Sequence, residues 1–184
     1  MSPWRMTARF FSRTTVTVVL LLGFFILLRL FREPERSLDF PFDSKQTYYV
    51  QRVVDGDTVL LDDGTRVRLL GVDTLETKHP TKPVHPLGVL AAYYTRKHVE
   101  GKNVRLQFDR ERRDRYNRVL AYLFIDGWFL NEELIREGYS KAEIKYPYSN
   151  IMKKRFLKAE AEAREQQKGI WNDKWKGTIE NFSG

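Results

Sequence analysis

Acidic side chains and one arginine stand at the ends of strand-like runs near the middle of this sequence. They are Asp55, Asp57, Arg68, Asp73 and Glu76. Carboxylate oxygens are the ligands that hard divalent cations prefer, and a planar guanidinium binds phosphate oxygens in a two-point contact. Carboxylates that converge beside an arginine therefore suit a cation that holds an anionic substrate, and this combination predicts phosphate chemistry.

A predicted β-hairpin explains how these side chains could meet. Residues 59–61 and 66–70 are strand-like, and Asp63-Gly64 between them is a turn signal. The hairpin would bring Asp57 close to Arg68, and the two remaining acidic residues would follow just beyond its second strand.

The segments after the hairpin alternate between loop, helix and strand. The three prolines of a loop at 78–86 exclude regular structure there. Beyond it we predict a helix ending at Gly101, strands at 104–108 and 119–125, a helix that Asn131 caps and Gly138 ends, and a charged helix that stops at Gly169. This pattern alone predicts a mixed α+β domain.

Three motifs resemble those of the staphylococcal nuclease (thermonuclease) family. They are D-G-D-T at 55–58, R-L-x-x-x-D-T-x-E at 68–76 and D-R-Y-N-R-V-L-A-Y at 114–122. A lone D-G-D is a common turn, but three motifs in this order and spacing are specific. The resemblance covers about 48–171. It implies an α+β fold, a five-stranded OB-fold Greek-key barrel with about three helices, and hydrolysis of phosphodiester bonds in DNA and RNA.

The resemblance also implies a Ca²⁺ site. Asp57, Asp73 and the backbone carbonyl of Thr74 match the family's metal ligands. Two carboxylates with much water predict moderate to weak affinity. Taken alone, Asp57 would be a turn-forming residue. Asp55 precedes the turn, and we expect it to cap backbone amides rather than to bind metal.

Three residues match the family's catalytic side chains. Arg68 and Arg118 correspond to two arginines that hold the phosphodiester under attack, where charge gathers on the equatorial oxygens. Glu76 corresponds to a glutamate that positions or deprotonates the attacking water. Without the motifs, each would be taken for an ordinary surface residue.

Three further matches imply contacts to the nucleotide. Arg115 and Tyr116 match positions that meet the terminal phosphate, and Tyr146 matches a tyrosine that stacks near the base. Bases that can stack in this way are unpaired, so we expect single-stranded or frayed duplex substrate. The chain departs from the family at Ile144, where a second tyrosine is usual, and at Leu75, where proline is usual and leucine loosens the loop before Glu76.

Composition limits the remaining possibilities. The 184 residues suffice for one domain, and the absence of cysteine excludes a disulfide scaffold and a cysteine-bound zinc site. The net charge is +8, of which +4 falls in residues 1–36, where six arginines oppose two glutamates. The excess left to the remainder is too modest to establish nucleic-acid binding by itself.

The N-terminal part predicts a membrane segment. After a basic tail at 1–13, residues 14–31 are almost wholly apolar and would span roughly 27 Å as a helix. A cleavable signal peptide, followed by secretion, is the alternative. No small-x-small site follows, which favours an uncleaved single-pass anchor with the nuclease on the non-cytoplasmic side. A linker at 32–46, the nuclease domain at 47–174 and a tail at 175–184 complete the predicted organisation.

Two rival functions stay open at this level. One is a catalytically weak OB-fold module that binds nucleic acid, and the other is a metal-dependent phosphodiesterase acting on a small nucleotide or lipid head group. A module that only binds could lose any catalytic residue, whereas this chain retains the whole set. A basic rim at Lys78, Lys82, Arg110, Arg112 and Arg113 favours a polymer over a small substrate. No obligate protein partner is evident from the sequence.

Overall fold

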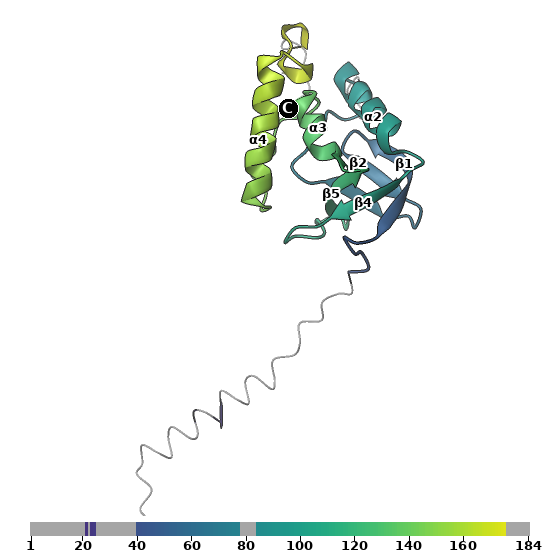
Figure 1. Cartoon of the computed structure of the whole chain (residues 1–184), viewed down its shortest axis with the longest axis vertical. Coiled ribbons are helices and arrows are strands. Elements are labelled where there is room, and N and C mark those ends of the chain that lie inside the picture. The colour runs from purple at the N-terminus through teal and green to yellow at the C-terminus, as the bar shows by residue number, and fades with distance from the viewer. Residues whose placement is uncertain (1–20, 22, 25–39, 78–83, 176–184) are drawn as a thin grey trace, which may run out of the picture. The chain divides into compact units, whose positions relative to one another are not determined.

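The structure is a computed structural model, which describes residues 40–77 and 84–175 together with Leu21, Gly23 and Phe24. The chain divides into two compact units, Met1–Pro41 and Phe42–Gly184. The second unit contains all the described strands, and its fold is shown in Figure 1.

Five strands close into a barrel. They are β1 (Thr47–Asp55), β2 (Thr58–Leu61), β3 (Arg66–Leu69), β4 (Asn103–Gln107) and β5 (Val119–Ile125). Antiparallel pairing joins β3, β2, β1, β4 and β5 in that order, and a parallel pairing of β3 with β5 closes the ring. The two-residue strand β6 (Trp128–Phe129) extends β5 as a hairpin. The predicted five-stranded barrel is therefore confirmed.

The predicted hairpin forms as expected and places the motif residues. β2 and β3 pair with Thr58 opposite Arg68, and the amide of Leu69 donates to the carbonyl of Asp57 at 2.9 Å. Alternating apolar residues of these strands, such as Val59 and Val67, are fully buried in the barrel. Arg68 therefore emerges on the opposite face of the strand, next to Asp57.

Helices cover the barrel. They are α2 (Pro86–Val99), α3 (Leu130–Arg136), α4 (Asn150–Glu165) and the short 3₁₀ helix η1 (Gly169–Trp171). In Figure 1, α3 lies between α2 and α4. Phe156 of α4 is buried against Tyr122 and Phe129, so the narrow apolar stripe of α4 packs onto the barrel as its spacing predicts.

Two local predictions are wrong. Asn131 does not cap α3, because the cap position is Phe129 and the buried Asn131 amide instead bonds the amide of Leu123 and the carbonyl of Leu70. Pro86 does not belong to a loop. It occupies the first turn of α2, where the missing N–H costs no hydrogen bond, and His85 caps that helix.

The predicted membrane segment at 14–31 lies outside the described residues, except for Leu21, Gly23 and Phe24. Among the residues that the structure does describe, no helix combines the length and the apolar character needed to cross a membrane. The predicted anchor stays a prediction.

Candidate active site

Asp57 lies at the start of the hairpin and is almost fully buried. Its Oδ2 accepts hydrogen bonds from the amide and the hydroxyl of Thr74, at 2.8 and 3.1 Å, and its Oδ1 accepts one from the hydroxyl of Thr58 at 2.9 Å. A buried carboxylate needs such partners, and they fix the orientation of this one. The carboxylate is therefore held in place before any ligand arrives.

Arg68 joins two of the predicted metal ligands. Its Nη2 donates to Asp73 Oδ1 at 2.6 Å, and its Nη1 forms an ion pair with Asp57 Oδ2. The Nη1 atom is buried and is not aligned for a hydrogen bond. Burial lowers the pKa of Arg68, Asp73 opposes that effect and the nearby Arg118 adds to it. Even so, the guanidinium is charged at neutral pH.

The loop after β3 is held from the far side of the chain. The amide of Asp73 donates to the hydroxyl of Ser140 at 2.8 Å, and Thr74 forms an isolated antiparallel bridge with the same residue. The carboxylate of Asp73 stays largely exposed, with 58% of its side chain accessible. Asp73 can therefore bind a ligand while its backbone stays fixed.

Glu76 lies beside a second carboxyl group rather than among the metal candidates. A hydrogen bond with Asp55 and partial burial raise the pKa of Glu76 to about 7. Asp55 itself accepts from the amide of Gly56 at 2.9 Å and the amide of Thr77 at 3.4 Å, so it caps backbone amides as predicted. A carboxyl group with this pKa can exchange a proton with water near neutral pH.

Helix α2 supports the loop that carries Glu76. An ideal Cβ placed on Gly88 would lie 2.5 Å from the carbonyl oxygen of Leu75 and 2.9 Å from that of Glu76. Only glycine allows the helix and this loop to approach so closely. The leucine that replaces the usual proline at position 75 is thus compensated by contact with α2.

A tight turn between β4 and β5 presents the second arginine. Asp114 accepts from the amide of Arg118 at 2.9 Å and from its Nε at 2.7 Å, and also from the amide of Tyr116. Burial raises the pKa of Asp114, but these hydrogen bonds outweigh it and bring the pKa below its ordinary value. Asn117 has a φ of 62°, the left-handed conformation that asparagine tolerates.

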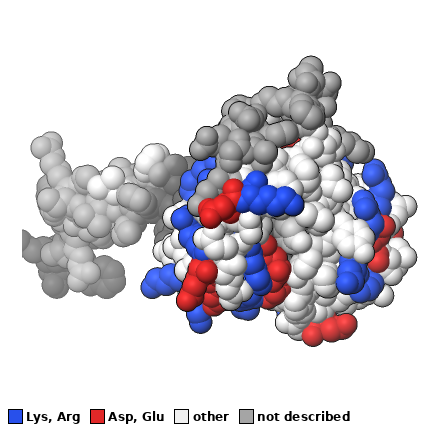
Figure 2. Space-filling view, turned by 90° about the horizontal axis from the view of Figure 1, so that it is seen from above, with Lys and Arg blue, Asp and Glu red and all other residues white. Residues whose placement is uncertain are grey.

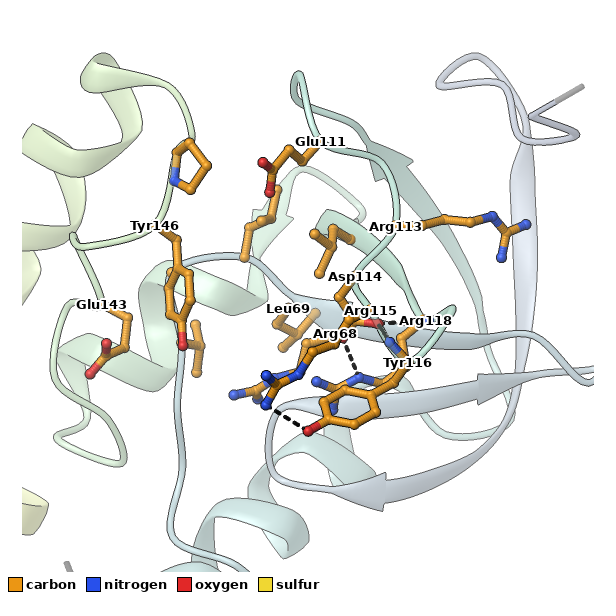
Figure 3. Close-up of a pocket in the computed structure, with 15 residues that line it drawn as sticks. Arg68, Leu69, Glu111, Arg113, Asp114, Arg115, Tyr116, Arg118, Glu143 and Tyr146 are labelled. Carbon is orange, nitrogen blue, oxygen red and sulfur yellow. Dashed lines mark hydrogen bonds and ion pairs between the residues drawn. The ribbon is translucent and has the colours of Figure 1, made fainter. Parts of the chain in front are cut away.

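A pocket of about 680 Å³ lies between this turn and the loop before α4. Figure 3 shows Arg68, Arg115, Tyr116 and Arg118 gathered on one side of the pocket, with Tyr146 on the other. The Arg115 guanidinium lies over the Tyr116 ring, 4.8 Å from its centroid. Both tyrosines are more than half exposed, so their ring faces are open to a ligand.

The structure brings the predicted residues together in two adjoining groups. Asp57, Asp73 and Thr74 meet at Arg68, and the nucleotide candidates meet Arg68 again from within the pocket. Glu76 adjoins the first group through Asp55, and its pKa responds to the charges of Arg68 and Asp73. An anion in this pocket would meet two guanidinium groups, with a carboxyl group of near-neutral pKa close by.

Sequence reasoning missed the residues that hold this site in place. They are Ser140, Gly88 and Asp114. Ser140 and Gly88 act through contacts with distant parts of the chain, which no local pattern reveals. Asp114 carried a signal, because an aspartate four residues before Arg118 in a turn can bond both its backbone and its side chain.

Comparisons with known proteins agree with this geometry. The family described as staphylococcal nuclease homologue matches residues 66–173. A thermonuclease of Staphylococcus intermedius is 40% identical over 164 residues, which cover 84% of this chain and 96% of that protein. A thermonuclease of Staphylococcus hyicus is 38% identical, covering 76% and 84%, and the endonuclease YncB of Bacillus subtilis is 32% identical, covering 84% and 77%. This chain belongs to the staphylococcal nuclease family of phosphodiester-hydrolysing enzymes.

Proposed function

We propose that this chain is a Ca²⁺-dependent endonuclease that hydrolyses DNA and RNA, preferably where the strand is single or frayed. The observation that carries the proposal is the convergence of Asp57 and Asp73 on Arg68, with Arg118 close enough to influence its pKa. Oxygen ligands for a cation and cationic donors for a phosphate therefore adjoin each other.

The donor set fits Ca²⁺. Asp57, Asp73 and the carbonyl of Thr74 are the proposed ligands, and all three offer hard oxygen atoms. Asp57 and Asp73 each present a carboxylate oxygen to the same guanidinium, so two negative charges already share one cationic neighbour. In the described part of the chain, no three acidic or histidine side chains form a denser cluster, which suits a weak site completed by water. When bound, Ca²⁺ would supply a Lewis acid for the phosphate oxygens and would lower the pKa of a nearby water.

Arg68 and Arg118 are the proposed ligands of the phosphate. Arg68 is fixed by two carboxylates and Arg118 by Asp114, so neither guanidinium has to be ordered when substrate binds. Charge develops on the phosphate oxygens during attack, and donors fixed beforehand stabilise that charge most effectively.

Glu76 is the proposed general base. As the carboxylate, it would take the proton from the water that attacks phosphorus, while the leaving oxygen departs from the opposite side. Its pKa of about 7 lies near the working pH, which is where a general base is most effective.

The pocket accounts for the preference for unpaired strands. Arg115 and Tyr116 would meet the terminal phosphate, and Tyr146 would stack on a base. A base reaches the open face of Tyr146 only when it has left the duplex stack. Stacking tolerates any base, so both DNA and RNA fit.

We further propose that residues 14–31 tether the enzyme to a membrane, with the nuclease domain on the non-cytoplasmic side. The basic tail, the apolar run and the missing small-x-small site support this proposal. Extracellular millimolar Ca²⁺ would fill a weak site there.

Hydrolysis of single-stranded DNA and RNA by the purified full-length chain tests the proposed function. Glu76→Ala and Arg118→Ala should each lower turnover by on the order of 10²-fold or more with the fold retained. Wild-type binding without hydrolysis, or near-normal rates in both variants, would favour the binding module instead.

A further inference from the structure

The first half of α4 has a charge distribution that helix stability does not explain. Its first nine residues contain four basic side chains and no acidic one: Lys153, Lys154, Arg155 and Lys158. The helix dipole favours acidic residues near the N-terminus and disfavours basic ones. The proximal part of α4 therefore gives up some local stability, and a binding role would explain why.

Most basic side chains elsewhere around α4 are neutralised by ion pairs. Arg155 pairs with Glu132, and Arg164 pairs with Glu160 in the second half of the helix. Positive and negative side chains also lie next to each other on the face shown in Figure 2. By contrast, Lys153, Lys154 and Lys158 form no ion pair with any residue that the structure describes. We call these three lysines the α4 ridge.

The α4 ridge begins next to the nucleotide pocket. Pro147 lines the pocket, and the Nζ of Lys153 lies 5.1 Å from the ring centroid of the adjoining Tyr148. Asp109 Oδ2 accepts from the amide of Ser149 at 2.7 Å, so the start of α4 is fixed to the basic loop that forms the opposite wall. The ridge and the pocket thus belong to one continuous surface.

We propose that a single-stranded polynucleotide runs from the pocket over the α4 ridge, with its phosphates bound by these lysines. This inference rests on the proposed function and specifies its substrate as a polymer. Lys154 and Lys158 stand one helical turn apart, about 6 Å along the axis, so they can meet different parts of one backbone. Exposed Ile151 and Leu157 beside them offer apolar surface to the bases or sugars.

The test compares a single-stranded 30-mer with a dinucleotide as substrates of the full-length chain at saturating Ca²⁺. Replacing all three lysines by glutamine should raise the ratio of the two KM values on the order of tenfold, and should reduce the salt dependence of the 30-mer KM by about 0.7 per lost contact. The triple arginine variant should restore both. Thermal stability should be equal or higher, because the change suits the helix dipole.

A matched control removes three exposed cations elsewhere: Arg52, Lys97 and Lys102 to glutamine. This control should leave the KM ratio and the salt slope unchanged. An unchanged ratio in the α4 variant, or an equal change in the control, would overturn the proposed strand path while leaving the enzyme a nuclease. If the ridge instead governs binding to vesicles of phosphatidylglycerol and not the 30-mer KM, it is a lipid contact and the proposal is wrong. An inactive wild type would count against the proposed function itself.

Discussion

Arg68 has a double electrostatic role in the candidate site. It neutralises Asp57 and Asp73 while no other cation is described there, and it faces the pocket in which the phosphate would bind. Its neighbour on the same strand, Arg66, is exposed and contributes to neither group. The two arginines therefore separate a site-specific effect from the effect of one positive charge on β3.

Arg68→Ala should lower turnover by on the order of 10²-fold or more, because the phosphate loses a fixed bidentate donor. Arg66→Ala should stay close to the wild-type rate. Steady-state kinetics on single-stranded DNA, with circular dichroism to verify folding, measures both. Equal rates in the two variants would remove Arg68 from the catalytic group.

Among the secondary-structure elements, Asp109 connects the barrel to α4. It accepts hydrogen bonds from the Tyr122 hydroxyl and the Ser149 amide, each at 2.7 Å. Burial raises the pKa of Asp109, but these bonds outweigh it and lower the pKa below its ordinary value. A lowered pKa in the folded state means that the stabilisation is present above the unfolded-state pKa of about 4 and is lost as the pH falls through the folded value.

Asp109→Asn should therefore reduce the free energy of unfolding by about 1–3 kcal/mol at neutral pH, because hydrogen bonds to a charged acceptor are lost. The difference from wild type should shrink as the pH is lowered below about 4. Urea denaturation across this pH range provides the measurement. The exposed Asp62→Asn variant serves as a control that should show little change at any pH, and a pH-independent loss in Asp109→Asn would contradict the linkage.

The strands and the site motif could be predicted from sequence, because both depend on local patterns. β5 has the predicted bounds, and the hairpin brings Asp57 to Arg68 as its turn signal implies. Asn131 was misassigned because its partners, the carbonyl of Leu70 and the amide of Leu123, come from other segments of the barrel. The support that Ser140 gives Asp73 likewise spans 67 residues of sequence. Tertiary partners of this kind leave no periodic signal.

At the scale of the whole molecule, the first 36 residues decide where the enzyme acts. They carry half of the net charge and the apolar run at 14–31. If that run spans a membrane uncleaved, the mature chain should sediment with membranes and resist extraction by alkaline carbonate. Protease added outside intact cells should digest the nuclease domain. A soluble form that begins near residues 33–39 would show signal cleavage, and protection from external protease would show the opposite orientation.

The dependence of hydrolysis on the metal ion tests the central claim most directly. The full-length chain is incubated with single-stranded and plasmid DNA in Ca²⁺, in Mg²⁺ and in chelator. We expect cleavage in Ca²⁺ and none in chelator, with Mg²⁺ a poor substitute because it demands a tighter octahedral shell than two carboxylates and a carbonyl provide. Full activity in chelator, or equal activity in Mg²⁺, would contradict the assignment of Asp57, Asp73 and Thr74 as a Ca²⁺ site.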